Sequence, residues 1–367
     1  MKKEIKLFDL TKQYKTISKE INSKIIKVLR DGQYILGPNV DGFEKKFSNK
    51  FSTKYAITCN SGTDSLIFAL KALDVGAGDE VITSPFTYFS TAEAIVQCGA
   101  KPIFVDIDPL TFNINAHLIE NAITNKTKAI LPVHIFGQSS DMITIKKIAR
   151  KYGLKIIEDC AQSIGATFKK LYTGTFGDFG CFSFFPTKNL GAIGDAGITI
   201  TTNKKYAEKL KQLRNHGGLL RNEHEMLGHN SRMDEIQAAV LGIKLKYLEI
   251  FNRKRNHIAK LYNSMIQNKF IRLPYKHEDS YHVFHQFTLC INSREKFIKH
   301  LNKHKVPYGI YYPKPLYKQK ALKGICSLKK MPVTEKVTNQ CISIPIYPEL
   351  ENKSVEYISE IINKYKE

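Results

Sequence analysis

Lys188 lies in a segment that could convert a lysine side chain into a nucleophile. The segment follows the apolar run 181–185 and is succeeded by Gly191, Gly194 and Gly197. An amine in an apolar pocket has a lowered pKa, so it can attack an aldehyde carbon and form a Schiff base. A single lysine in a loop is more often a solvated surface residue. The segment therefore indicates a nucleophile only if other parts of the chain complete a site.

The segment 59–64 has the residue types of an anion-binding turn. An apolar run ends at Cys59, Gly62 permits a tight turn, and a helical pattern begins near Asp64. Backbone N–H groups and the helix dipole attract anions at the start of a helix, and the Thr63 hydroxyl adds a donor. Ordinary helix capping accounts for the same residue types. Taken alone, the segment is compatible with either role.

Two carboxylates, Glu158 and Asp159, end another predicted strand that begins at Lys155 and contains Ile156 and Ile157. Ligands of open α/β sheets bind at the carboxyl ends of the strands, where a carboxylate can hold a cationic ring nitrogen. A turn-capping role is the alternative for Asp159 alone. An anion cradle, a carboxylate and an aldehyde-trapping lysine, in this chain order, are the groups that pyridoxal phosphate requires. Together the three segments favour a pyridoxal-phosphate site over capping and surface charge.

Short apolar runs alternate with amphipathic stretches over residues 1–200. The apolar runs predict strands at 55–59, 81–84, 102–106, 129–135, 155–158, 181–185 and 198–202. The amphipathic stretches predict helices at 64–73, 90–98, 117–123 and 142–152, and a further helix is predicted at 204–213, after the last strand. This alternation is typical of an α/β fold with a mostly parallel sheet and helices on both faces. The Gly-rich segment 186–197 joins the predicted strands 181–185 and 198–202, and we expect this connection to contain no crossover helix.

A long amphipathic run at 234–266 predicts one helix that links two domains. Beyond it, strand-like runs at 283–291 and 308–312 mix with helical patterns at 294–304 and 355–365. Such a mixture is typical of an α+β unit. We therefore expect a large α/β domain at 1–245, which would bind pyridoxal phosphate on its seven-stranded sheet, and a smaller C-terminal α+β domain at 246–367.

Composition and charge exclude several classes of protein. With 43% hydrophobic and 25% charged residues, the chain of 367 residues is not expected to be disordered. The net charge of +22 comes from lysines spread over helical patterns, without a basic block interleaved with aromatic residues. We interpret this charge as a solvated lysine-rich surface and expect no nucleic-acid partner.

Seven cysteines occur without a C-x-x-C pair. This arrangement predicts neither a disulfide framework nor a zinc site, so we expect no metal and a reducing, cytoplasmic location. Residues 1–10 lack the apolar core of a signal peptide, and no apolar run approaches ~18 residues. We therefore expect neither secretion nor association with a membrane.

The whole chain resembles the DegT/StrS family of nucleotide-sugar aminotransferases, which are pyridoxal-phosphate enzymes of the aspartate-aminotransferase fold, fold type I. The resemblance is carried by the segments 31–38, 61–66, 78–82, 85–88, 134–138, 158–165, 180–191 and 228–239. The Lys188 segment and the run from Asn230 to Gln237 are highly specific as a pair. The resemblance thus implies fold type I and pyridoxal phosphate as cofactor.

The resemblance also implies individual roles. Lys188 would form the Schiff base and move the proton, and Asp159 would keep the ring nitrogen protonated. The implied phosphate contacts are Gly62, Thr63, Ser183 and, from a neighbouring subunit, Asn230. The implied ring contacts are Tyr88 on the ring face and Gln162 at the ring hydroxyl. The implied substrate contacts are Tyr34, Arg232, Tyr311, Tyr312 and Lys314.

Because Asn230 would serve the site of a neighbouring chain, the functional unit would be a homodimer with shared active sites. Structural roles remain open for two of these residues, since Tyr88 would also suit a core position and Asn230 a helix cap. Three histidines offer further acid–base groups: His216, His224 and His229. No histidine is needed for proton transfer if Lys188 moves the proton, so these three are left with structural or substrate-binding roles.

The implied reaction transfers an amino group from glutamate, through pyridoxamine phosphate, to a UDP- or dTDP-linked keto sugar for surface polysaccharides such as lipopolysaccharide O-antigen. The run from Asn230 to Asp234 looks like relatives that aminate 3-keto sugars, whereas many relatives acting at carbon 4 carry Asn-Tyr-Arg-Met. Amination at carbon 4 stays as an alternative. A sugar dehydratase is a second alternative, but relatives with that activity have His at the position of Lys188, so the lysine favours amino transfer. A non-catalytic regulatory protein of the same fold is a remoter alternative.

Overall fold

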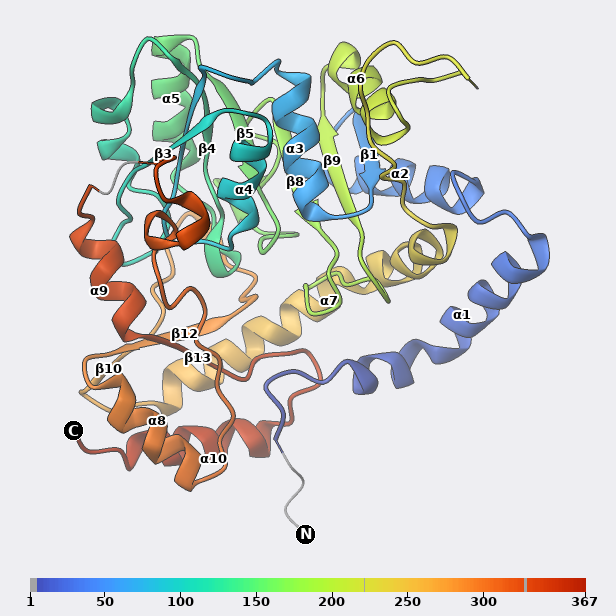
Figure 1. The fold of residues 1–367 in the computed structure, drawn as a ribbon. Coiled ribbons are helices and arrows are strands. Elements are labelled where there is room, and N and C mark those ends of the chain that lie inside the picture. The colour runs from blue at the N-terminus through green and yellow to red at the C-terminus, as the bar shows by residue number, and fades with distance from the viewer. Residues whose placement is uncertain (1–4, 221, 327–328) are drawn as a thin grey trace.

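A seven-stranded sheet forms the centre of the molecule (Figure 1). The computed structural model describes residues 5–220, 222–326 and 329–367. In spatial order the strands are β1 (Tyr55–Cys59), β9 (Gly197–Thr201), β8 (Phe179–Ser183), β5 (Lys155–Asp159), β4 (Thr127–Leu131), β2 (Glu80–Thr83) and β3 (Lys101–Phe104). Strand β9 is antiparallel to both of its neighbours, and the other pairs are parallel. The predicted mostly parallel seven-stranded sheet is confirmed.

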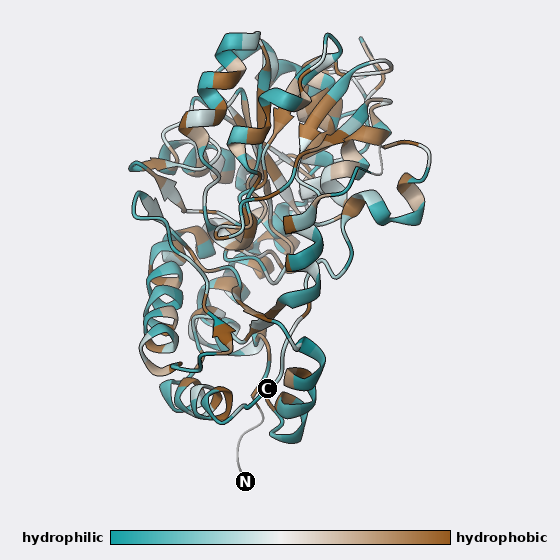
Figure 2. Cartoon of the chain, turned by 90° about the vertical axis from the view of Figure 1, so that its left-hand side faces the viewer, coloured by the Kyte–Doolittle hydropathy of each residue, from teal (hydrophilic) through white to brown (hydrophobic). Residues whose placement is uncertain are grey.

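Helices cover both faces of this sheet because successive side chains of a strand point to opposite faces. On β5, Ile157 packs into one layer and Ile156 into the other. One layer contains α3 (Gly62–Ala72), α4 (Ser90–Gln97) and α6 (Lys204–Arg214). The opposite layer contains α2 (Pro38–Lys50), α5 (Met142–Tyr152) and α7 (Glu235–Met265). Figure 2 shows hydrophobic residues concentrated on the central strands and hydrophilic residues along the outer helices.

The C-terminal part is built on a small antiparallel sheet that packs against the end of α7. Its strands are β10 (Ile271–Arg272), β12 (Phe287–Ile291) and β13 (Cys341–Ile344), and its helices are α8 (Arg294–Lys303), α9 (Pro332–Gln340) and α10 (Asn352–Asn363). Tyr262 of α7 belongs to the same hydrophobic cluster as Phe287 and Phe297. Because α7 is continuous, a domain boundary at 245/246 would fall inside it. The division into 1–245 and 246–367 stays a prediction.

A third, short sheet anchors the segment before β12 to the large part of the molecule. It pairs β11 (Ser280–Tyr281) with β6 (Thr167–Phe168), which in turn pairs with β7 (Leu171–Tyr172). The predicted strand at 283–291 is therefore confirmed only for its second half, which is β12. The residues between β11 and β12 turn toward the central sheet instead of extending β12.

Two other predicted elements are wrong. The predicted helix at 117–123 is replaced by two 3-10 turns, Ala116–Leu118 and Glu120–Ala122. A segment this short forms too few helical hydrogen bonds to offset the cost of nucleation. The predicted strand at 308–312 forms only an isolated bridge at Gly309. Tyr312 has a positive φ of 57°, which ends the extended run, and Pro313 after it has no N–H to donate to a neighbouring strand.

Two N-terminal helices, α1 (Leu10–Asp31) and α2, lie outside the sequence predictions. The residue before α2 is Gly37, which has no side chain to cap the helix. Glu235 at the start of α7 replaces that cap, because its carboxylate accepts hydrogen bonds from the N–H groups of Gly37 (2.9 Å) and Val40 (2.8 Å). None of the helices in the described ranges combines the length and apolar character needed to cross a bilayer.

Candidate active site

A cavity of about 430 Å³ opens at the carboxyl ends of the parallel strands. Asp159 ends β5, Ser183 ends β8, and Gly62 begins α3 shortly after β1. Ligand sites of open α/β sheets occur at this edge. Nine of the predicted residues line the cavity, namely Gly62, Thr63, Tyr88, Asp159, Gln162, Ser183, Lys188, Tyr311 and Tyr312. The fold thus brings the three segments of the predicted site together.

The N-terminus of α3 forms one wall of the cavity. Ser61 caps the helix by accepting a hydrogen bond from the Asp64 N–H (3.1 Å). The N–H groups of Gly62 and Thr63 belong to the first turn and have no acceptor within the helix. A Cβ on residue 62 would lie 2.6 Å from the Cβ of Ser183, so only glycine lets α3 approach β8 this closely. The wall therefore offers N–H and hydroxyl donors to a phosphate.

Asp159 supplies a fixed carboxylate in the cavity. Its side chain is 5% exposed. One carboxylate oxygen accepts a hydrogen bond from the Thr91 hydroxyl (2.9 Å) and the other from the Ala161 N–H (3.1 Å). Burial raises the pKa of Asp159 above its usual value, while these two hydrogen bonds and the charge of Lys188 oppose the rise. A cationic ligand group beside Asp159 would favour the ionised carboxylate further.

Lys188 lies on the loop that follows β8. Burial lowers the pKa of its ammonium from 10.5 to about 8, and the negative charge of Asp159 opposes this change. The loop is held at both ends, because the Lys188 N–H donates to the Phe185 carbonyl (2.8 Å) and the Lys244 ammonium donates to the Gly191 carbonyl (2.7 Å). The Lys188 ammonium donates no hydrogen bond within the described residues. It is therefore available to a group that enters the cavity.

Gln162 and Tyr312 are joined across the cavity wall. The side-chain oxygen of Gln162 accepts a hydrogen bond from the Phe136 N–H (2.7 Å). The side-chain nitrogen of Gln162 donates to the Tyr312 hydroxyl (2.5 Å). Tyr312 also stacks on the Phe136 ring, with the ring centroids 6.1 Å apart. Tyr88 lies at the mouth and is 66% exposed, which leaves one face of the cavity open.

Four predicted residues do not line the cavity of their own chain: Tyr34, Asn230, Arg232 and Lys314. Asn230, Tyr34 and Lys314 are exposed. Arg232 donates a hydrogen bond to the side-chain oxygen Oδ1 of Asn215 (3.1 Å). The intervening Ser231 donates to the Asp64 carboxylate (2.7 Å), so the segment 230–232 lies against the outside of α3.

The cavity also contains a histidine that the sequence predictions missed. His285 lines it from the segment between β11 and β12 and is 6% exposed. The three histidines singled out from the sequence do not line it: His216, His224 and His229. No motif marks His285, which sits in an apolar run that is typical of a strand. Contacts with distant segments bring it to the cavity: β11 pairs with β6, and the Val283 N–H donates to the Gly137 carbonyl (2.9 Å).

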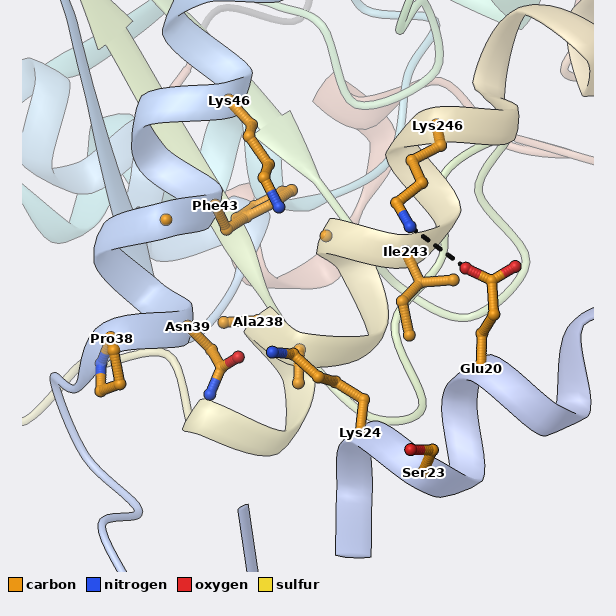
Figure 3. Close-up of a pocket in the computed structure, with 13 residues that line it drawn as sticks. Glu20, Ser23, Lys24, Pro38, Asn39, Phe43, Lys46, Ala238, Ile243 and Lys246 are labelled. Carbon is orange, nitrogen blue, oxygen red and sulfur yellow. Dashed lines mark hydrogen bonds and ion pairs between the residues drawn. The ribbon is translucent and has the colours of Figure 1, made fainter. Parts of the chain in front are cut away.

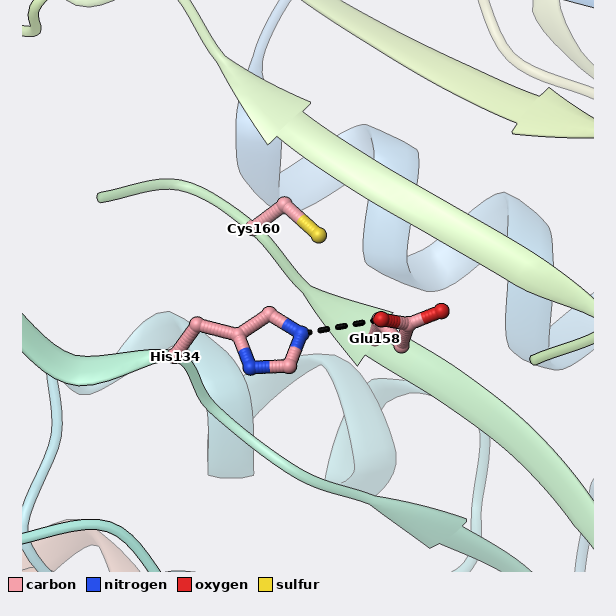
Figure 4. A group of neighbouring side chains, drawn as sticks. All are labelled: His134, Glu158 and Cys160. Atoms are coloured by element: carbon pink, nitrogen blue, oxygen red, sulfur yellow. Dashed lines mark hydrogen bonds and ion pairs between the residues drawn. The ribbon is translucent and has the colours of Figure 1, made fainter. Parts of the chain in front are cut away.

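Behind Asp159, three potential metal ligands gather in the core: His134, Glu158 and Cys160 (Figure 4). His134 Nδ1 accepts a hydrogen bond from the Ser140 N–H (3.0 Å), so its Nε2 donates to Glu158 (3.0 Å). The Glu158 carboxylate also accepts from three backbone N–H groups of the loop 174–177. Because the His134 nitrogens and the Glu158 oxygens are engaged, we interpret this cluster as support for the strand that carries Asp159.

A second cavity, of about 370 Å³, lies between α1, α2 and α7 (Figure 3). Lys24, Lys46 and Lys246 surround it, and Lys246 forms an ion pair with Glu20 (3.1 Å). None of the predicted site residues lines this cavity. The groups able to perform chemistry therefore gather in the cavity that contains Lys188.

Comparisons with known proteins agree with this geometry. The chain matches the DegT/DnrJ/EryC1/StrS aminotransferase family over residues 15–363. It is 40% identical to a pleiotropic regulatory protein of Geobacillus stearothermophilus, over 98% of both chains. It is 40% identical to a UDP-N-acetyl-3-dehydro-alpha-D-glucosamine 3-aminotransferase of Acidithiobacillus ferrooxidans, over 98% of this chain and 97% of the relative. It is 42% identical to a dTDP-3-amino-3,6-dideoxy-alpha-D-galactopyranose transaminase of Aneurinibacillus thermoaerophilus, over 98% of this chain and 99% of the relative.

Solved structures confirm the expected fold type I. The structure of DesV from S. venezuelae in complex with a ketimine intermediate has a TM-score of 0.96 and 36% identity, covering 98% of both chains. The structure of ntda from Bacillus subtilis with bound cofactor PMP has a TM-score of 0.92 and 33% identity, covering 98% of this chain and 84% of that one. Both the family match and the similarities extend over nearly the whole sequence. The chain therefore belongs to the DegT/DnrJ/EryC1/StrS aminotransferase family.

Proposed function

We propose that this protein transfers an amino group from glutamate to carbon 3 of a UDP- or dTDP-linked keto sugar, with pyridoxal phosphate as cofactor. The observation that carries the proposal is the convergence of Lys188, Asp159 and the Gly62 turn on one cavity. The names of the two sugar aminotransferases reported above support the nucleotide-sugar substrate and carbon 3. The product would enter the synthesis of surface polysaccharides such as O-antigen. Seven free cysteines support a reducing, cytoplasmic location.

The residues present suit pyridoxal phosphate. Gly62 and Thr63 offer N–H donors, and Ser183 a hydroxyl, to the phosphate, while Asp159 suits the ring nitrogen in its cationic form. When bound, the cofactor supplies an aldehyde carbon that reacts with amines and a ring that withdraws electrons from the bound amine. Gln162 borders the same space, but its amide already binds Tyr312, so a contact with the ring hydroxyl would be shared with that tyrosine.

Lys188 would hold and move the proton. At neutral pH an amine with a pKa of about 8 is unprotonated roughly 300 times more often than one with a pKa of 10.5. The Nζ atom can therefore take a proton from the substrate carbon and return it to another atom of the same site. Asp159 keeps its negative charge beside the ammonium form, which limits how far the pKa falls. Both protonation states of Lys188 are thus accessible near neutral pH.

We further propose a homodimer in which Asn230 serves the phosphate site of the neighbouring chain. The exposed placement of Asn230 outside its own cavity supports this arrangement. The adjoining loop carries three exposed leucines, Leu219, Leu220 and Leu227, and the last is 92% exposed. A group of exposed apolar side chains is typical of an interaction surface. Arg232 and Tyr34 remain predicted substrate contacts.

The first experiment is the visible absorption spectrum of the purified protein with added pyridoxal phosphate. We expect a visible absorption band that bleaches when glutamate is added and returns when a 3-keto nucleotide sugar is added. Lys188→Ala should show neither the band nor turnover. Bleaching reversed only by a 4-keto sugar would move the reaction to carbon 4. A band without turnover on any keto sugar would instead favour a regulatory role, as the name of one relative suggests.

A mixed dimer tests the shared site. Lys188→Ala and Asn230→Ala chains are each expected to have low activity. If sites are shared, a mixed dimer contains one intact site, formed by Lys188 of one chain and Asn230 of the other. Activity should then return when the two inactive proteins are dissociated and reassociated together. Failure of the mixture to regain activity would contradict the shared site but not the aminotransferase reaction.

A further inference from the structure

His285 is a buried group of the Lys188 cavity that the proposed reaction does not use. It lines the cavity and is 6% exposed. Its Nδ1 atom lies 3.2 Å from the side-chain oxygen of Asn189, the residue that follows Lys188. A hydrogen bond therefore joins this histidine to the loop that carries the reactive lysine.

A chain of amide hydrogen bonds fixes the direction of this contact. Asn252 of α7 donates through its amide nitrogen to the Ile164 carbonyl (3.1 Å), which leaves its oxygen to accept from the Asn189 amide (2.9 Å). Asn189 donates through the same nitrogen to the Val283 carbonyl (3.0 Å). The Asn189 oxygen must therefore be the acceptor toward His285. Since an acceptor faces Nδ1, the His285 proton lies on Nδ1.

The other ring nitrogen, Nε2, is left with a lone pair. Burial keeps the pKa of His285 well below its ordinary value, and the positive charges of Lys188 and Arg255 lower it further. The imidazole is therefore neutral, and its single N–H is the one bound to Asn189. Within the described residues, Nε2 makes no hydrogen bond. It is an unused acceptor in the same cavity as the unused donors of the Lys188 ammonium.

We propose that His285 is a positioning residue whose Nε2 accepts a hydrogen bond from the Lys188 side chain whenever that nitrogen is not bound to cofactor. Lysine has four rotatable side-chain bonds, so its Nζ can reach an acceptor that lines the same cavity. Asn189 holds the imidazole in the required tautomer. The inference rests on the proposed function, because a lysine that is alternately bound and released needs a defined position in its released state.

Two matched variants separate the acceptor from the link to the loop. In His285→Gln, a side-chain oxygen can occupy the position of Nε2 and keep the acceptor. In His285→Asn, an amide nitrogen can occupy the position of Nδ1 and keep the bond to Asn189, but the acceptor is lost. Both replacements are amides, so they desolvate Lys188 to a similar extent. His282→Asn is the control, because His282 is buried on the same segment but does not line the cavity.

The decisive readout is the pKa of Lys188 in the cofactor-free protein, measured by acetic anhydride labelling across neutral and alkaline pH with peptide mass spectrometry. An acceptor stabilises the ammonium form, so His285→Asn should lower this pKa by about one pH unit below wild type. His285→Gln and His282→Asn should match wild type. The remaining titratable and charged groups around the cavity are the same in all variants: Tyr88, Asp159, Asp195, Arg255, Tyr311 and Tyr312. An unchanged pKa in His285→Asn overturns the proposal.

A second readout needs no substitution at His285. Nitrogen NMR of the histidine-labelled protein should show a proton on Nδ1 of His285, and Lys188→Met should shift the Nε2 resonance. A proton on Nε2 overturns the proposal even if the His285 variants fail to fold. In the cofactor-loaded enzyme, His285→Asn should lower kcat while the affinity for pyridoxal phosphate stays unchanged. Because labelling and NMR need no turnover, failure of the aminotransferase assignment would be recognised separately by the spectrum with glutamate.

Discussion

Replacing Lys244 with methionine should stabilise the protein near neutral pH and destabilise it at high pH. Lys244 is 7% exposed on α7, and its ammonium donates to the Gly191 carbonyl of the Lys188 loop (2.7 Å). Burial lowers its pKa from 10.5 to about 8, with Glu349 opposing the change. A buried ammonium with one protein acceptor is costly, whereas methionine has a similar length and no charge.

The magnitude follows from this pKa. At 1.36 kcal/mol for each pH unit, lowering the pKa from 10.5 to about 8 corresponds to roughly 3 kcal/mol lost from the folded state below pH 8. Between these two pH values the unfolded chain retains a proton that the folded chain has released, so wild-type stability rises with pH. Methionine removes this dependence but leaves the Gly191 carbonyl without its donor, at a cost of about 1 kcal/mol. The variant should therefore gain about 2 kcal/mol near neutral pH and lose its advantage near pH 10.

The assay is urea denaturation of both proteins at a series of pH values, with pyridoxal phosphate at one saturating concentration because ligand binding shifts apparent stability. Lys260→Met is the matched control, since Lys260 is exposed on the same helix. It should change the free energy of unfolding by no more than about 0.5 kcal/mol. A stability difference between Lys244→Met and wild type that stays constant with pH would refute the reasoning.

Three further variants test the site and its support. Asp159→Asn should reduce kcat/KM by at least about 100-fold, because it removes the charge that the proposed function places beside the ring nitrogen of the cofactor, while a urea midpoint at or above wild type would show that the fold is intact. Glu235→Ala should lower the free energy of unfolding by about 2–4 kcal/mol in urea, since it leaves the first N–H groups of α2 uncapped. Tyr312→Phe should cost about 1 kcal/mol by thermal denaturation, because Gln162 loses its acceptor.

The central sheet and the positions of Lys188 and Asp159 at one edge of it could be predicted because local sequence determines them. Lys188 and Asp159 each follow an apolar strand, and residues at the carboxyl ends of parallel strands share one edge of a sheet. The helix predicted at 142–152 agrees with α5 at both ends, where Asp141 caps the first turn and Gly153 ends the last. Here the local preferences and the tertiary packing agree.

Other features depend on contacts between distant segments and have no local pattern. His285 reaches the cavity because its segment is held by distant parts of the chain, through the pairing of β11 with β6 and the bond from the Val283 N–H to the Gly137 carbonyl, whereas its surrounding residues look like a continuous strand. The cap of α2 comes from Glu235, almost two hundred residues later in the chain. The turn at Tyr312 has a positive φ, and the aromatic residues around it give no sequence signal for such a turn. In each case tertiary structure overrides the local preference.

One face of α7 holds two segments of the chain next to the Lys188 cavity, the Lys188 loop and the segment that carries His285. Asn252 and Arg255 follow Lys244 by eight and eleven residues, so the three side chains lie on one side of the helix. Lys244 holds the Gly191 carbonyl, Asn252 holds the Asn189 amide, and Arg255 donates to two carbonyls just before β12. Apolar side chains would pack here without the desolvation cost of buried polar groups. Stability therefore does not explain this polar face, whereas positioning the Lys188 loop against the segment that carries His285 does.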